Sequence, residues 1–150
     1  MSRPEITAEE ALARLQHELA HPPFHSVLLP RALSADPVQG RVTILLPYQA
    51  HFARAAGSSA VHGGVIATLA DMAAHAAVAV QIGRMAPTID LRIDFLRAAP
   101  GADLYARAHT LRVGQSIARV DVEISGEEGP AVAVARGTFS TLAPQPKGAS

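Results

Sequence analysis

The stretch VHGGVIATLADMAAHAAVAVQI, residues 61–82, decides how this chain folds. After its two glycines it is apolar at all but four positions, which are Thr68, Asp71, His75 and Gln81. A membrane span would avoid that carboxylate and that histidine. A helix that is apolar on nearly every side is a buried helix, so we expect residues 63–82 to form the centre of the fold.

The length and the charge of the chain limit the number of domains and the kinds of partner that we expect. A chain of 150 residues suits one domain, residues 1–150, and is too short for two. Thirteen basic and 13 acidic residues give a formal net charge of zero, so we expect no nucleic acid and no membrane as partner. The absence of cysteine excludes disulfides and a thiol nucleophile. The charged first residues contain no apolar signal core, so we expect a cytoplasmic protein.

Apolar and polar residues alternate on both sides of the central helix, which predicts β-strands. One strand is expected at 38–46, where Val38, Gly40 and Val42 begin the alternation. Four more follow the helix, at about 89–95, 103–113, 116–125 and 131–142. One strand, a long helix and a run of antiparallel strands predict an α+β fold in which a sheet curls around the helix.

The two ends of the chain lie outside this pattern. Thr7-Ala8-Glu9-Glu10 is a capping box, in which Thr7 and Glu10 exchange hydrogen bonds, and it predicts an extra N-terminal helix over about 7–21. Pro22-Pro23 ends that helix. The tail, residues 143–150, is predicted to be flexible.

Gly63, Gly64 and Asp71 are the candidates for chemistry. A helix N-terminus has free amide donors, and two glycines leave room for an incoming oxygen, although they also permit tight packing. A carboxylate at Asp71, in the middle of a buried helix, needs either an arginine partner or a function. Eight residues separate Gly63 from Asp71, which is about 12 Å along a helix axis. If both act on one carbonyl, they come from two chains across a twofold interface.

The HGG motif at 62–64, the spaced Asp71 and the strand at 89–97 resemble the hotdog acyl-CoA thioesterases of the PaaI (phenylacetate-degradation) type, and more broadly the 4-hydroxybenzoyl-CoA thioesterase-like family. The resemblance covers about 38–142. It implies a hotdog fold, a homodimer or dimer of dimers with shared active sites, and no cofactor beyond the coenzyme A of the substrate. Asp71 would be general base or nucleophile, and the Gly63 amide of the partner chain would stabilise the oxyanion.

The resemblance also implies supporting residues. Thr88 stands where related proteins place a hydroxyl near the acid, and His62 shapes the loop beside the catalytic residues. Ala56 replaces an asparagine that is common in the family, for which Ser58 and Ser59 are possible substitutes. Substrate contacts are further expected from Gly64 and, for the phosphates of coenzyme A, from four arginines: Arg54, Arg92, Arg97 and Arg112.

Three other interpretations compete with the thioesterase. His17-Glu18-Leu19-Ala20-His21 matches the H-E-x-x-H zinc motif, but His17 points away from the apolar face of its helix and no third ligand is apparent, so no metal is expected. A hotdog hydratase or dehydratase would need His51 or His62 as a catalytic histidine. A non-catalytic acyl-CoA-binding module would bind ligand without releasing thiol. The sequence leaves open the acyl group and the choice between coenzyme A and an acyl carrier protein.

Overall fold

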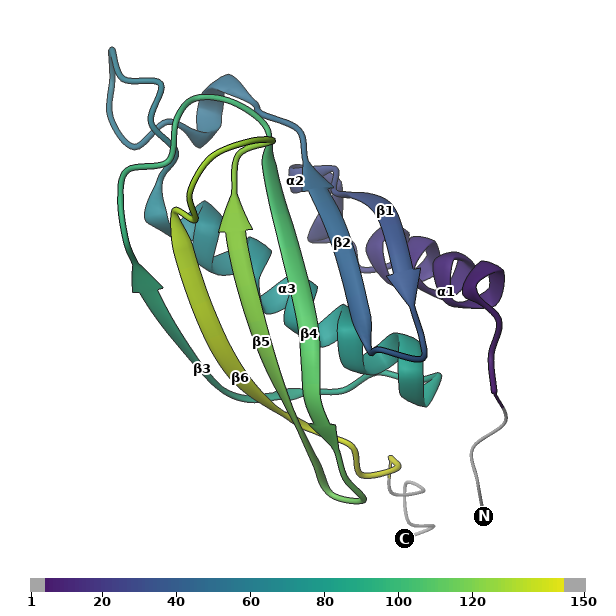
Figure 1. Cartoon of the computed structure of the whole chain (residues 1–150). Helices are drawn as coiled ribbons and strands as arrows, with labels where there is room; N and C mark the ends of the chain where they lie inside the picture. Colours follow the sequence, from purple (N-terminus) through teal and green to yellow (C-terminus); the bar gives the residue numbers. More distant parts are fainter. Residues whose placement is uncertain (1–4, 145–150) are drawn as a thin grey trace, which may run out of the picture.

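Six antiparallel strands form one sheet that wraps around a long helix (Figure 1). The computed structural model describes residues 5–144, so the predicted flexible tail lies almost wholly outside the described residues. The strand order is β1-β2-β4-β5-β6-β3. In chain order the strands are β1 (Arg31–Asp36), β2 (Arg41–Leu46), β3 (Thr88–Phe95), β4 (Leu104–Val113), β5 (Ile117–Ser125) and β6 (Ala133–Ser140). This arrangement confirms the predicted hotdog architecture.

The central helix α3 spans Gly63–Ile82, as predicted. His62 caps its start, and Gly83 ends it in a left-handed conformation with φ of 71°. Its length and its mean hydropathy of 1.6 would suit a membrane span, yet α3 packs against the strands β2 to β6. Most of its buried residues are alanines, whose small side chains let the strands approach the helix closely.

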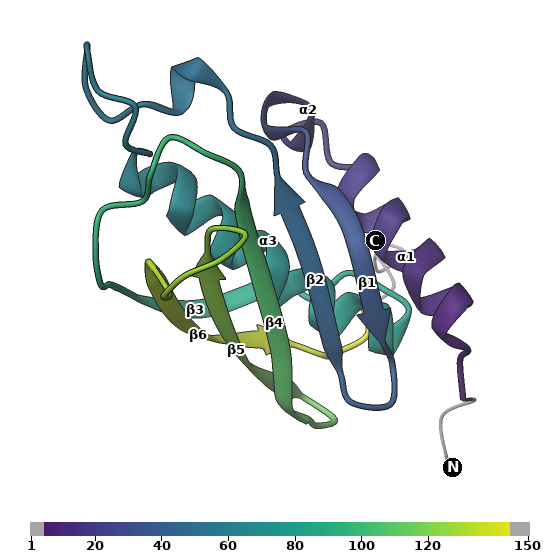
Figure 2. The ribbon, with the colours of Figure 1, turned by 45° about the horizontal axis from the view of Figure 1, so that its top comes forward.

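The N-terminal helix α1 (Ala8–Ala20) lies beside β1 and α3, as the two views of Figures 1 and 2 show. Both hydrogen bonds of the predicted capping box are present: the Glu10 amide donates to the Thr7 hydroxyl, and the Thr7 amide donates to the Glu10 carboxylate. Ala11, Leu15 and Leu19 form its buried face. A short helix, α2 (His25–Leu28), and a 3-10 turn, η1 (Ala50–Phe52), complete the helical elements of the described residues.

The N-terminal half of the sheet corrects the sequence prediction. Two strands precede α3 instead of one, and the sheet begins at Arg31 rather than near residue 38. Val38 is 84% exposed in the β1–β2 turn, where the Asp36 carboxylate accepts the amides of Val38 and Gln39. β1 escaped detection because it is a bulged edge strand with little burial and therefore no clear alternation. The strands after the helix agree with the prediction within a few residues.

The two edges of the sheet differ in how they are protected. β1 is short, bulged, flanked by Pro30 and Pro37, and packed against α1, which are ordinary ways to block further pairing. β3 pairs only with β6 and leaves Ile89 58% exposed and Phe95 55% exposed. The open edge of this sheet is therefore β3.

Candidate active site

Asp71 and Thr88 lie together, as the sequence suggested. The Thr88 hydroxyl, at the start of β3, donates a hydrogen bond of 2.8 Å to Oδ1 of Asp71 on α3. No hydrogen bond between described residues reaches the other carboxylate oxygen, and none of the ion pairs among residues 5–144 includes Asp71. The carboxylate therefore has no arginine partner there and keeps one oxygen for a water or a substrate.

Asp71 lies on a partly open stripe of α3 rather than deep in the core, which corrects the expectation of a helix buried on nearly every side. The stripe consists of Gly64, Thr68, Asp71 and His75, spaced at i, i+4, i+7 and i+11. Gly64 is exposed and the other three are half-buried. α1 approaches the His75 end of the stripe, where Glu18 and His75 lie 3.8 Å apart. The Gly64–Asp71 part remains accessible.

The start of α3 leaves one particular amide free. Nδ1 of His62 accepts the Gly64 amide at 2.8 Å, and the His62 carbonyl accepts the Val65 amide at 3.0 Å. No described atom accepts a hydrogen bond from the Gly63 amide. The Gly63 amide is therefore free to donate to an oxyanion, whereas the Gly64 amide is already bonded to His62, so a substrate contact of Gly64 would not use its amide.

The two glycines also differ in whether the surrounding structure leaves room for a side chain. A Cβ on Gly64 would lie 2.9 Å from Nδ1 of His62, so the cap itself requires glycine there. A Cβ on Gly63 would lie 3.4 Å from Cε1 of Phe95, an ordinary contact. Packing within the chain thus does not demand a glycine at Gly63, while Phe95 lies beside it. Phe95 is a neighbour of the site that the sequence did not single out.

Gly63 and Asp71 lie in the same chain but not in the same place. Both belong to α3, about 12 Å apart along its axis. Strand β3 runs past both, with Thr88 against Asp71 at one end and Phe95 against Gly63 at the other. The chain therefore presents the carboxylate and the amide donor at two separate positions along α3.

The loop before α3 lies beside the segment after β3. The Arg54 amide donates to the Ala60 carbonyl, and the Val61 amide donates to the Ala99 carbonyl. Arg97 belongs to this second segment, and its guanidinium donates to the Ala131 carbonyl. The structure therefore places Arg54 and Arg97 at the Gly63 end of the molecule, where both side chains are exposed.

The serines of this loop have local roles. The Ser58 hydroxyl accepts the Ala60 amide at 3.2 Å, and Ser59 packs closely on Gly101. Ala56 is exposed on the same loop. Among the described residues neither serine forms a hydrogen bond with Asp71, so within the chain neither takes the place of the missing asparagine beside the carboxylate.

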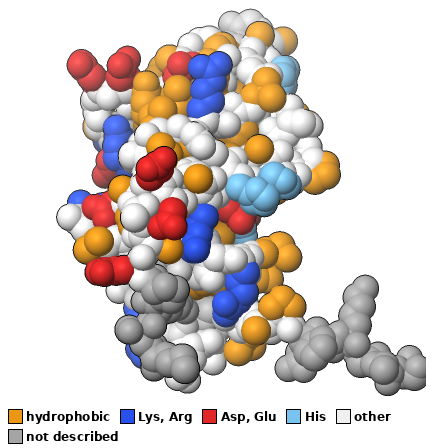
Figure 3. Space-filling view, turned by 90° about the vertical axis from the view of Figure 1, so that its right-hand side faces the viewer, with side chains coloured by type: hydrophobic (Ala, Val, Ile, Leu, Met, Phe, Trp, Pro, Cys, Tyr) orange, Lys and Arg blue, Asp and Glu red, His pale blue; other side chains and the backbone are white. Residues whose placement is uncertain are grey.

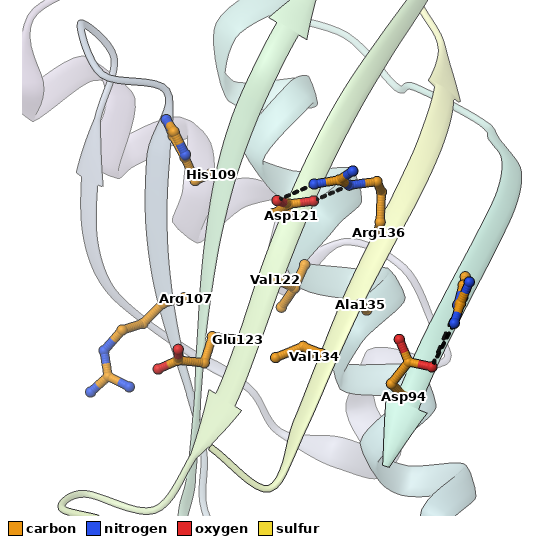
Figure 4. Close-up of a pocket in the computed structure, with 10 residues that line it drawn as sticks. Asp94, Arg107, His109, Asp121, Val122, Glu123, Val134, Ala135 and Arg136 are labelled. Carbon is orange, nitrogen blue, oxygen red and sulfur yellow. Dashed lines mark hydrogen bonds and ion pairs between the residues drawn. The ribbon is translucent and has the colours of Figure 1, made fainter. Parts of the chain in front are cut away.

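Arg92 and Arg112 lie on the outer face of the sheet, away from α3. A depression of about 500 Å³ on this face is lined by charged side chains from β3 to β6 (Figure 4). Arg92 pairs with Asp94 at 3.3 Å, and Arg136 pairs with Asp121 at 2.6 Å. Arg112 lies further along this face, near the β4–β5 hairpin. Within the chain, the structure therefore does not bring Arg92 or Arg112 together with Asp71.

The histidines considered for a zinc site or for a hydratase make structural contacts. His17 and His21 stack with ring centroids 3.5 Å apart, and Figure 3 shows exposed histidine side chains on the α1 side. Among residues 5–144 no three His, Asp or Glu side chains gather where a metal ion could be held. His62 serves as the helix cap, and His51 lies edge-on to Phe52. No contact in the described residues favours a catalytic histidine of the hydratase type.

A sheet curled around a helix, with a free amide at the helix start and a carboxylate at its middle, is the arrangement expected of a hotdog thioester hydrolase. The chain belongs to the thioesterase superfamily, whose sequence pattern matches residues 59–133. The resemblance to hotdog thioesterases is thereby confirmed.

Individual relatives agree with this family. The medium/long-chain acyl-CoA thioesterase YigI of Escherichia coli K12 is 31% identical, over 89% of this chain and 96% of its own length. The PaaI protein of the E. coli phenylacetic acid degradation operon superimposes with a TM-score of 0.77 at 25% identity, covering 91% and 99% of the two chains. Zebrafish thioesterase superfamily member 2 gives a TM-score of 0.74 at 26% identity, again over 91% and 99%.

Proposed function

We propose that this thioester hydrolase is an acyl-CoA thioesterase that acts as a homodimer, in which each active site combines Asp71 of one protomer with the Gly63 amide of the other. The observation that carries the proposal is the path of β3. This open edge strand contacts Asp71 through Thr88 at one end and Gly63 through Phe95 at the other.

Pairing of two β3 edges completes the site. An edge strand that pairs antiparallel with its own copy does so about a twofold axis, and when the full strands pair this axis passes between Leu91 and Arg92. Thr88 of one protomer then lies opposite Phe95 of the other. Because Thr88 holds Asp71 and Phe95 lies beside Gly63, the carboxylate of one chain meets the amide donor of its partner.

The open stripe of α3 supports the same arrangement. Gly64 and Thr68 are small, so a second α3 can approach closely along this face. The exposed Ile89 and Phe95 side chains would be removed from water by the same pairing. A dimer of dimers would use further surfaces, and sedimentation velocity distinguishes it from a dimer.

In the proposed chemistry the carboxylate and the amide donor have different tasks. Asp71, held through Oδ1 by Thr88, activates a water or attacks the thioester carbon with its other oxygen. The partner's Gly63 amide donates to the oxyanion that develops on the carbonyl oxygen. The thiolate of coenzyme A leaves. These steps need no cofactor.

The substrate class rests on the relatives and on the charges near Gly63. YigI is named for medium- and long-chain acyl-CoA, and PaaI for a phenylacetic acid operon. Arg54 and Arg97 lie at the Gly63 end, where guanidinium groups could bind the phosphates of coenzyme A. We therefore expect a coenzyme A ester rather than an ester of an acyl carrier protein.

Thiol release from a panel of short, medium, long and aromatic acyl-CoAs tests the activity. The wild-type protein should hydrolyse at least one ester, while Asp71→Asn, which keeps the size of the side chain and an acceptor for Thr88, should lose nearly all turnover. If the wild-type protein binds acyl-CoA but releases no thiol, it is a binding module. If Asp71→Asn is as active as wild type, Asp71 is not the catalytic carboxylate.

Mixed dimers test whether the sites are shared. Asp71→Ala and Gly63→Pro chains are each expected to be inactive as homodimers. In a mixed dimer one site regains both groups, so random mixing of equal amounts should restore about a quarter of wild-type turnover. Sites contained within single chains would give no recovery on mixing, which would refute the shared arrangement.

A further inference from the structure

His75 lies where α1, α3 and the segment before β3 meet, one helical turn after Asp71. Its side chain is 21% exposed. Nε2 accepts the Ala86 amide at 3.2 Å, and Nδ1 lies 3.8 Å from Oε2 of Glu18 on α1. The proposed hydrolysis gives this half-buried histidine no role.

The contacts define the state of the ring. An amide only donates, so Nε2 must carry the lone pair and the proton of the neutral ring resides on Nδ1, facing Glu18. Burial lowers the pKa of His75 from its usual 6.5, while the nearby carboxylates of Glu18 and Asp71 partly oppose that effect and His25 reinforces it.

The two arginines near this junction bond to backbone carbonyls rather than to the His75 ring. Arg14 of α1 donates to the Val80 carbonyl, and Arg84 donates to the Thr141 carbonyl. Among the described residues, the titratable groups that act on the His75 ring are therefore Glu18 from α1, His25 from α2 and Asp71 from α3 itself.

The anchored amide is close to the active site along the chain. Only Pro87 separates Ala86 from Thr88, and the proline ring restricts rotation in this segment. The Pro87 carbonyl accepts the Ser140 amide from β6 at 2.8 Å, so β6 holds one side of the segment and His75 holds the other. The segment in turn presents the Thr88 hydroxyl to Asp71.

We propose that His75 is a positioning residue of the thioesterase site, which fixes the Ala86–Thr88 segment where the Thr88 hydroxyl orients Asp71. This inference rests on the proposed function of Asp71. It adds a built-in acid limit: a proton on Nε2 turns the acceptor into a donor, so the ring can no longer hold the Ala86 amide. Activity then falls in acid as the His75 ring takes up this proton.

Kinetics of four variants test the role: His75→Leu, His75→Gln, Thr88→Val and the double variant His75→Leu/Thr88→Val. Leucine fills a similar space but accepts no hydrogen bond, so kcat should fall about 10- to 100-fold with KM unchanged. Glutamine retains an acceptor, so it should recover part of kcat. If His75 acts through Thr88, the double variant is no slower than Thr88→Val alone.

The pH profile separates positioning from simple packing. Wild-type kcat should have an acid limb to which His75 contributes, whereas His75→Gln, which does not titrate, should lose that contribution. Equal acid limbs in the two proteins, wild-type kcat in His75→Leu, or effects of His75→Leu and Thr88→Val that multiply would each overturn the inference.

Amide exchange gives a readout that does not depend on turnover. The Ala86 amide should be protected in the wild-type protein and less protected in His75→Leu, with His75→Gln between them. Should leucine prevent folding, the glutamine variant and its pH profile carry the test. A wild-type protein that releases no thiol refutes the proposed function itself, whereas active enzyme with an unaffected His75→Leu variant refutes only the positioning role.

Discussion

Replacement of Gly63 by proline would remove the proposed oxyanion donor with little change elsewhere. Gly63 is the first residue of α3, the position at which helices accept proline most readily. His62 has φ of −62° and ψ of 135°, the extended conformation that residues before proline prefer. No described atom accepts a hydrogen bond from the Gly63 amide, so folding should lose none.

The expected loss of activity is large because the amide acts on the transition state. Removal of one oxyanion donor typically lowers kcat about 100- to 1000-fold, or about 2.7–4 kcal/mol. KM should change little, since the donor faces charge that develops only during the reaction. Thermal unfolding of Gly63→Pro should remain close to that of the wild-type protein.

Gly63→Ala is the matched control. Alanine keeps the N–H, and its Cβ would lie 3.4 Å from Cε1 of Phe95, an ordinary contact. Initial rates of thiol release at saturating acyl-CoA compare the two variants at equal dimer content. If Gly63→Pro stays within about fivefold of Gly63→Ala, the loss is far below that of an oxyanion donor and the assignment is wrong.

Three further changes test the fold rather than the chemistry. Gly40→Ala should destabilise more than Gly57→Ala by about 1–3 kcal/mol in urea unfolding, because both glycines have positive φ but only a Cβ at Gly40 would clash, 1.9 Å from Oγ1 of Thr110; equal losses would contradict that clash. Thr7→Ala should cost about 1 kcal/mol through the lost cap of α1, and an unchanged midpoint in urea would contradict it. Arg136 holds the pKa of Asp121 below its usual 3.8, so this exposed pair stabilises the protein above about pH 4 and the contribution is lost as the pH falls further. The stability difference between wild type and Asp121→Asn should therefore be below about 1 kcal/mol at pH 7 and should shrink in acid, and a difference that grew in acid would reverse the sign of the argument.

The sequence alone was enough for the central helix, the strands after it and the N-terminal cap. These features depend on the order of apolar residues and on hydrogen bonds between near neighbours, which a sequence displays directly. The eight-residue spacing of Gly63 and Asp71 also predicted that the two can act on one carbonyl only from two chains, because distance along one helix follows from the number of residues. The pairing of Thr88 with Asp71 was suggested by family resemblance and is present in the structure.

Only the tertiary structure decided which of these groups are free to act. That Gly63 rather than Gly64 keeps an unused amide depends on the direction of the His62 ring. The separation of the arginines depends on the fold, which carries Arg92 and Arg112 on the outer face of the sheet and Arg54 and Arg97 on loops at the Gly63 end. The sequence also did not predict β1, because a bulged edge strand with few buried residues shows no clear alternation. Nor did it predict the anchoring of Ala86 by His75, because a single contact across 11 residues leaves no periodic pattern. Sequence determines local conformation and burial through neighbours along the chain, whereas the availability of a donor or a carboxylate depends on neighbours that only folding brings into contact.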